Sequence, residues 1–313
     1  MPGLPDYNAQ RILNDVTGAQ PIGNAAATRY LGFWTTAPSG DAGATGATEV
    51  SGGAYARVQV AGALTAASTI STASSTFTLA STAPAWLLAL GTNGSGCNVY
   101  DLTNGKQIGT VSSISGTTVT LTGNAANNGS GSSDSIQFSA FGVASASSGS
   151  EPGTTAANAT NGAVIAFPQA TANWGSVLAW FLNDALNSGN YLFWDYMGAY
   201  VWQAASVSSA SPGVLTSHAH GLSVNDNCVI SIKAGGALPT FSAGNFTGPL
   251  TVAHAATDTF DVKTSGGTAV NTSATGDVLF RKITGDGAGN AGQPININVT
   301  FSFAASQLTL YAA

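Results

Sequence analysis

Two histidines separated by one residue, His218 and His220, come nearest in this sequence to a metal-binding pair. In an extended strand, residues two apart point to the same face, so both imidazoles would face one ion. A tetrahedral zinc site needs more ligands than two, and no Cys or carboxylate stands beside the pair. The alternative is that His220 belongs to a turn and His218 faces solvent. We therefore assign no metal site, unless a symmetry axis brings several copies of the pair together.

Paired carboxylates are the next candidates, because glycoside hydrolysis uses two Asp or Glu side chains that flank the scissile bond. The carboxylates considered are spread along the chain and form no local cluster: Asp41, Glu49, Asp184 and Asp195. The sequence also lacks a phosphate-binding P-loop, a nucleophile elbow, a Cys–His nucleophile and zinc-ligand spacing. We predict no catalytic residue, no cofactor and no enzymatic activity.

Large aromatic residues are concentrated in residues 163–202 of a chain otherwise rich in small residues. Core packing is the default expectation for most of them, because aromatic side chains bury the largest area. A row with one exposed face would instead pack between subunits or stack on sugar rings. The candidates for such an interface or glycan-facing row are Tyr191, Trp194, Tyr196, Tyr200 and Trp202.

The elements that position these residues are expected to be short strands. Residues 6–16 are the one expected helix, capped by Asp6 and ended by Gly18. Strands are expected at 29–36 and 54–62, at 164–167, 176–182 and 191–196 within the aromatic stretch, and at 85–90. Near the carboxyl end, residues 295–303 alternate, which predicts that Ile297, Val299, Phe301 and Phe303 face inward.

Two regions differ from the rest because they are rich in Ser, Thr and regularly spaced turn residues. This pattern is typical of small antiparallel barrels or sandwiches. We predict a mainly β protein with a discontinuous β-sandwich-like core domain, one short N-terminal helix and two inserted small β-barrel or sandwich modules. The core comprises residues 1–62, 149–205 and 284–313, and the modules are 63–148 and 206–283. Insertions are tolerated best at loop tips.

Composition limits the partners. Charged residues make up 7% of the chain and the net charge is −6, with no basic patch. Neither nucleic acid nor an anionic membrane surface is therefore an expected partner, and the apolar runs are too short to span a membrane. Cys97 and Cys228 lie in different modules, so we expect small buried residues and no disulfide. No leader is apparent, which predicts synthesis in the cytosol.

Several motifs resemble accessory virion proteins of tailed bacteriophages, the tail-fibre, minor structural and decoration proteins. The matching segments are 7–18 (YNAQRILNDVTG), 30–38 (YLGFWTTAP), 41–43 (DAG), 49–58 (EVSGGAYARV), 165–174 (IAFPQATANW) and 189–194 (GNYLFW). In that family the two halves lie close together in a shorter chain, whereas here residues 63–148 separate them. Residues 220–226, 248–252 and 257–262 are similar to a small β-barrel repeat of phage structural proteins.

The resemblance implies a non-enzymatic structural protein of the virion. Such a protein would self-associate, with a homotrimer as the expected symmetry, and would attach to other proteins of the capsid or tail through its core domain while the modules project outward. It also implies an alternative, an adhesin that contacts host surface glycans through the modules. Phage fibres can hold metal between histidine pairs at a trimer axis, which keeps His218 and His220 as the candidate pair.

Overall fold

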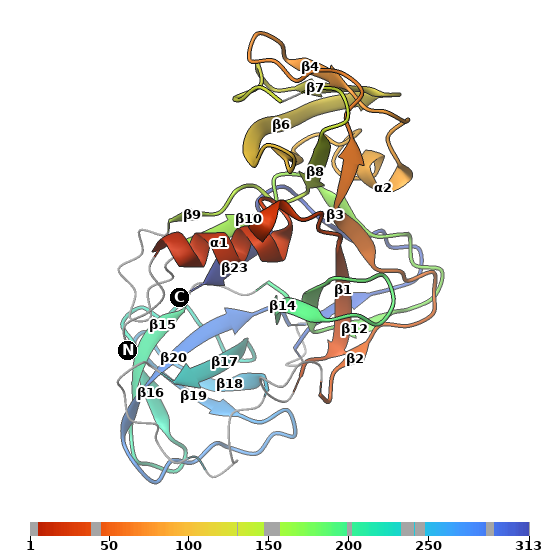
Figure 1. Cartoon of the computed structure of the whole chain (residues 1–313). Helices are drawn as coiled ribbons and strands as arrows, with labels where there is room; N and C mark the ends of the chain where they lie inside the picture. Colours follow the sequence, from red (N-terminus) through yellow and green to blue (C-terminus); the bar gives the residue numbers. More distant parts are fainter. Residues whose placement is uncertain are drawn as a thin grey trace.

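The computed structural model describes residues 6–38, 45–129, 131–146, 157–198, 202–232, 241, 248–285 and 291–312. The fold is mainly β, as predicted, with a ten-stranded sheet, three small sheets and a closed six-stranded barrel (Figure 1). The N-terminal helix α1 (Asp6–Thr17) is present. It ends at Gly18, whose φ of +67° is the left-handed conformation that glycine adopts at helix ends.

The large sheet is antiparallel throughout and joins strands from distant parts of the sequence. Its spatial order is β14 (Tyr191–Tyr196), β13 (Ala179–Asn183), β1 (Arg29–Thr36), β3 (Val58–Thr65), β8 (Ser135–Ser139), β5 (Asn98–Asp101), β6 (Lys106–Ser115), β7 (Thr118–Leu121) and β4 (Thr76–Thr78), and β2 (Thr48–Glu49) also pairs with β1. The first half of β3 pairs with β1 and its second half with β8. The expected boundary at 62/63 thus falls within a continuous strand, and the three-part domain division stays a prediction.

The carboxyl-terminal chain returns to the core in the three small sheets. These are β23 (Thr309–Ala312) with β10 (Ala157–Thr160) and β9 (Ser145–Ala146), β11 (Ile165–Ala166) with β22 (Ser302–Phe303), and β12 (Gly175–Val177) with β21 (Gln293–Ile295). Helix α1 packs against β10 and β23 (Figure 1). Residues far apart in sequence therefore close one core.

The barrel lies at the opposite end of the molecule from β4, β6 and β7 (Figure 1). Its strands, in order around the barrel, are β15 (Gln203–Val207), β16 (Val214–Thr216), β19 (Thr259–Lys263), β18 (Leu250–Ala255), β17 (Asn227–Ile232) and β20 (Gly276–Ile283). Leu215, Val252, Phe260, Val278 and Phe280 fill its interior. This hydrophobic cluster is separate from the main core.

The main core is centred on the aromatic side chain of Phe33 in β1. Its ring stacks on Phe167 at 4.1 Å between centroids and meets Phe301 edge-on at 5.3 Å. Trp180 is buried, and Phe193 stacks on it at 5.6 Å. Strand β1 packs beside the aromatic stretch, because β1 pairs with β13 along its length.

Three local expectations were wrong. Residues 85–90 form the short helix α2 (Ala85–Leu88) and not a strand, because Pro84 precedes a run of Ala and Leu, which are strong helix formers. The expected strand 176–182 is divided between β12 and β13, which belong to different sheets.

The third concerns the carboxyl-terminal alternation. Ile297 and Val299 are 52% and 41% exposed, whereas Phe303 is buried and Phe301 partly buried. Asn298 has a φ of +67°, and Val299 N donates to Asn296 O, so a turn interrupts the extended chain there. A short irregular helix η1 (Ile22–Asn24) completes the elements described.

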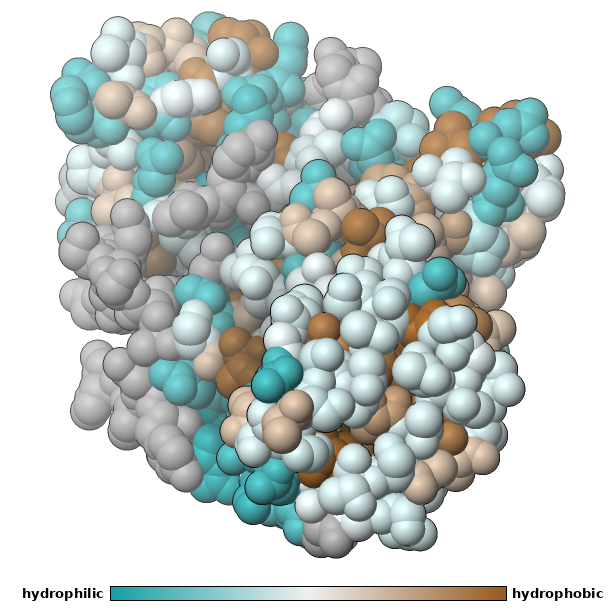
Figure 2. Space-filling view, turned by 90° about the horizontal axis from the view of Figure 1, so that it is seen from above, coloured by the Kyte–Doolittle hydropathy of each residue, from teal (hydrophilic) through white to brown (hydrophobic). Residues whose placement is uncertain are grey.

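Because few residues are charged, much of the surface consists of small polar and weakly apolar residues. Figure 2 shows a face dominated by residues of near-neutral hydropathy, with apolar residues in small separate groups. Within the described part of the chain, no helix has the length and apolar character needed to cross a membrane.

Candidate functional site

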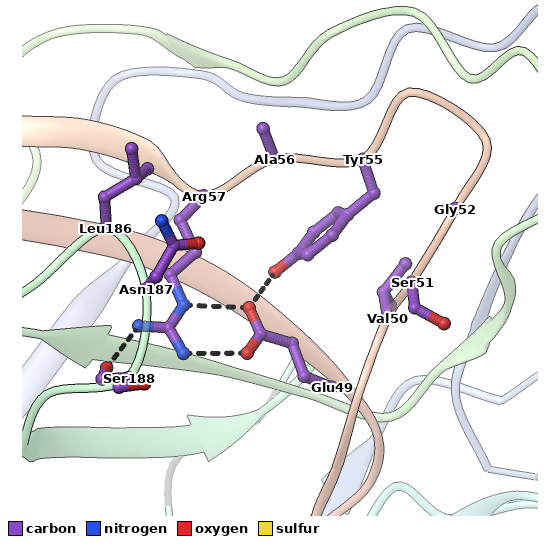
Figure 3. A pocket seen from close by; sticks show the side chains of 10 residues that line it. All are labelled: Glu49, Val50, Ser51, Gly52, Tyr55, Ala56, Arg57, Leu186, Asn187 and Ser188. Atoms are coloured by element: carbon purple, nitrogen blue, oxygen red, sulfur yellow. Dashed lines mark hydrogen bonds and ion pairs between the residues drawn. The ribbon is translucent and has the colours of Figure 1, made fainter.

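A hollow in the described part of the chain lies between the segment that leads from β2 to β3 and the turn that joins β13 to β14. It encloses about 360 Å³ and is lined by parts of residues 49–57 and 186–188 (Figure 3). The first wall bends because Gly52, Gly53 and Ala54 have φ values of +73°, +57° and +62°. The second wall belongs to the turn between β13 and β14, where Gly189 also has a positive φ. The bend of each wall thus follows from its own turn residues.

An ion pair forms the floor of the hollow. Arg57 Nε donates to Glu49 Oε1 at 2.8 Å, and the second guanidinium arm, Nη2, donates to Oε2 at 2.7 Å (Figure 3). This bidentate geometry is the strongest arrangement of a carboxylate and a guanidinium. The Arg57 side chain is 5% exposed and that of Glu49 is 27% exposed. Glu49 therefore faces both the buried arginine and the hollow.

Arg57 also holds the opposite wall in place. Its Nη1 donates to the carbonyl oxygens of Ala185 and Ser188, each at 2.8 Å. The guanidinium lies 5.1 Å from the ring centroid of Phe181 and 5.8 Å from that of Tyr191. One buried arginine, directly before β3, thus links strand β2 to the β13–β14 turn.

Tyr55 completes the floor. Its hydroxyl donates to Glu49 Oε1 at 3.0 Å and accepts from the backbone N–H of Phe33 at 2.8 Å. Burial raises the pKa of Tyr55 far above its usual range. The hydrogen bonds that Arg57 donates to Glu49 raise the pKa of Arg57 above its ordinary value, although burial opposes this. Arg57 and Tyr55 therefore keep their protons at all ordinary pH values.

The candidate carboxylates do not converge. Asp195 is buried and binds both guanidinium arms of Arg281, while Asp184 accepts two hydrogen bonds from Asn190 within its own turn. Asp41 lies outside the described residues. Glu49 is the one carboxylate that lines the hollow, and its oxygens already bind Arg57 and Tyr55. The hollow consequently has the chemistry of a binding surface.

The aromatic candidates divide between two local clusters. Tyr191 and Trp194 are partly buried around Trp34, at 5.1 and 5.8 Å between ring centroids. Tyr196 is buried, and Trp202 is partly buried with Arg281 4.5 Å above its ring. Tyr200 lies outside the described residues. Among the described members, each ring packs on neighbours in its own chain.

The two histidines have unequal surroundings. His218 is 92% exposed and its Nδ1 lies 3.1 Å from Asp258 Oδ1. His220 is buried, its Nε2 lies 2.7 Å from the carbonyl oxygen of Ala256, and its Nδ1 accepts from the backbone N–H of Leu222. Both ring nitrogens of His220 are thus engaged by groups of its own chain. Asp258 is the carboxylate that the local sequence did not place beside the pair.

Sequence reasoning also missed the hollow and its central residue, Arg57. The available signal was the rarity of charge: Lys and Arg total 8 in 313 residues, so an arginine at the start of an apolar strand was a candidate for a buried partner. The alternation around it does not show which carboxylate it meets, because Glu49 is on another strand.

The β-rich fold and the family comparison together define a class, the fibre proteins of tailed bacteriophages. The matching family model is that of the podophage GP4 fiber I protein gp80, over residues 3–99 and 102–200. Because the match covers more than half of the chain, the chain belongs to this family. This confirms the resemblance to virion proteins. A fibre protein is part of the virion and associates with other virion components.

The family match ends shortly before β15, so the barrel and the carboxyl-terminal segment lie beyond it. Searches of curated proteins and of solved structures returned no match.

Proposed function

We propose that this chain is a non-enzymatic fibre protein that self-associates and attaches to the capsid or tail through the domain containing β1, β13 and β14. The observation that carries the proposal is the family match, which includes all three of these strands. The carboxylates support it, because Glu49 and Asp195 are bound to arginines and serve packing. A carboxylate held in a bidentate ion pair is a poor general acid or base.

Self-association would rest on apolar contact, since charge is scarce. Val164, Ile297 and Val299 are exposed at 38%, 52% and 41%, and they flank the region where β11 pairs with β22. A second copy that covers these side chains gains the transfer energy of apolar surface. A homotrimer is the proposed assembly, with the barrel and the β4–β7 end of the large sheet projecting outward.

Localisation and mass test this proposal together. An antibody to an epitope tag is expected to label intact particles at the capsid or tail in electron micrographs, and light scattering of the purified chain is expected to give three times its monomer mass. Absence of label from particles that infect normally contradicts the virion assignment. A stable monomer contradicts the trimer alone.

A second candidate function is glycan binding at the host surface, in which hydroxyl and amide side chains contact sugar. Exposed side chains of Ser51, Asn187 and Ser188 line the hollow and favour this function there. Binding of the chain to a glycan array tests it, and a chain that binds no glycan contradicts it. Cleavage of a host polysaccharide, lost on changing Glu49 or Asp195, would contradict the non-enzymatic assignment.

A further inference from the structure

We propose that the hollow between residues 49–57 and 186–188 binds one neutral sugar ring of a host surface glycan. This inference rests on the glycan-binding function and adds to it a site and a ligand class. The volume of about 360 Å³ is at the lower end of the range for small-molecule sites. A single ring fits that size better than a folded oligosaccharide does.

The charge of the hollow selects against ionic ligands. Glu49 and Arg57 neutralise each other in a bidentate pair, and the four hydrogen bonds that Arg57 donates go to Glu49, Ala185 and Ser188. An anionic ligand would have to compete with Glu49 for the guanidinium. A cationic ligand would compete with Arg57 for the carboxylate. A neutral ligand leaves the pair intact.

Unused hydrogen-bonding groups surround this neutral floor. The side chains of Asn187 and Ser51 are exposed and have no hydrogen-bond partner within the described part of the chain. Asn187 offers both donors and an acceptor, Ser51 offers a hydroxyl, and the part-exposed Glu49 retains acceptor capacity. Neighbouring sugar hydroxyls each donate and accept, so this mixture matches a polyol.

Apolar side chains also line the hollow beside these polar groups. Leu186 is 47% exposed on the rim, although it is a large aliphatic residue in a turn. The partly buried ring of Tyr55 lines the hollow as well, and Figure 3 shows it near the Glu49 end of the ion pair, with Asn187 near the Arg57 end. A pyranose has apolar C–H groups on its faces and hydroxyls around its edge. Leu186 and Tyr55 suit the former, and Asn187 and Ser51 suit the latter.

The floor is also preorganised, which reduces the cost of binding. Arg57 fixes the turn that carries Asn187 by holding Ala185 and Ser188, and Tyr55 is fixed to the backbone of Phe33. The hydrogen-bonding groups therefore need little rearrangement to meet a ligand.

Titration of the full-length chain with monosaccharides tests the inference. The probes are glucose, galactose, mannose and N-acetylglucosamine, with glucuronic acid and N-acetylneuraminic acid as anionic comparisons, and binding is followed by saturation-transfer NMR and calorimetry. We expect saturable binding of at least one neutral sugar and weaker binding of the acids. Asn187→Ala is expected to weaken binding about tenfold, the scale of one lost hydrogen bond, and Leu186→Ala is expected to weaken it as well.

Asn124→Ala is the matched control, because Asn124 is exposed on the distant end of the large sheet. It is expected to leave the affinity unchanged, and all variants are expected to unfold at the temperature of the parent chain. Absence of binding to every neutral sugar overturns the inference, as does binding that Asn187→Ala and Leu186→Ala leave intact. Tighter binding of the acids also overturns it.

Assays on virus particles that carry the variant chain distinguish the sugar site from the structural role proposed above. Asn187→Ala particles are expected to contain the normal amount of the chain and to adsorb less to host cells. Loss of the chain from the particles would be a failure of assembly, whereas normal adsorption by fully assembled variant particles contradicts the sugar site.

Discussion

Arg57 is a buried cation in a protein with few charged residues, and its burial explains each of its contacts. An unpaired buried ion costs several kcal/mol, so the guanidinium requires a carboxylate and further acceptors. Glu49 and the carbonyl oxygens of Ala185 and Ser188 supply them. The residue that shapes the hollow is therefore also the residue that fixes both of its walls.

The two cysteines give a prediction at the same scale. Burial raises the pKa of the Cys97 and Cys228 thiols to about 12, and the thiolate is the reactive form. The native protein at pH 8 is therefore expected to give no colour with a thiol-specific disulfide reagent over an hour. In denaturant both thiols are expected to react within minutes. Rapid stoichiometric reaction of the native protein would show that these side chains are accessible.

Asp184 gives a prediction about pH. Hydrogen bonds from the Asn190 side chain and backbone lower its pKa below the ordinary 3.8. Because the folded pKa lies below the unfolded one, the stabilisation from this contact is complete above the unfolded pKa and is lost as the pH falls through the folded value. Carboxyl-carbon NMR is expected to give a titration midpoint below 3.8 for Asp184, and Asn190→Ala is expected to raise it. A midpoint that Asn190→Ala leaves unchanged contradicts this account.

At the scale of elements, strand β1 contributes side chains to hydrophobic clusters on both faces of the large sheet. Phe33 points into the main aromatic core, while Gly32 and Trp34 face Phe181 on the other side. Gly32 is there because Phe181 occupies its side-chain space: a Cβ at this position would come within 2.3 Å of the Phe181 ring. The glycine allows β1 and the Phe181 side chain to pack closely.

Gly32→Ala is therefore expected to lower the free energy of unfolding by about 1–3 kcal/mol, through overpacking. Chemical denaturation followed by tryptophan fluorescence measures the change. Gly123→Ala is the control, since a Cβ there meets no atom within 4 Å, and its effect is expected to be small. Equal stability of the two variants would show that Phe181 moves aside at little cost.

At the scale of the molecule, a buried joint connects the barrel to the large sheet. Arg281 of β20 binds Asp195 of β14 through both guanidinium arms and lies 4.5 Å above the ring of Trp202. Tyr196, Val229 and Ile283 form an apolar cluster beside the pair. Thr284 N also donates to Met197 O at 2.9 Å. The barrel is thereby held in one orientation on the part of the chain that matches the fibre family.

The joint is tested by a double-mutant cycle. Arg281→Met alone is expected to cost about 3–5 kcal/mol, because Asp195 remains buried without its cation. Asp195→Leu combined with Arg281→Met is expected to cost much less than the sum of the single changes, since no charge is left unpaired. Denaturant unfolding followed by tryptophan fluorescence gives the energies. Additive energies would show that the pair is not coupled.

The sequence by itself determined the class of fold, the family resemblance and the most local features. Alternation and turn residues are short-range signals, so β14 at Tyr191–Tyr196 and the end of α1 at Gly18 were predicted correctly. The same signals failed at Ala85–Leu88, where helix propensity exceeded the strand expectation, and at Ile297 and Val299, where Asn298 turns the chain.

Only the tertiary structure decided which distant residues meet. Arg57 and Ser188 are 131 residues apart, and Asp195 and Arg281 are 86 residues apart. Neither pair shares a periodic pattern, because each is set by the order of strands in space and by the paths of the connecting turns. The hollow and the joint depend on these pairs. The partner of a buried ion is determined by the geometry of the fold and by the free-energy cost of leaving the ion unpaired. Neither can be predicted from the local sequence.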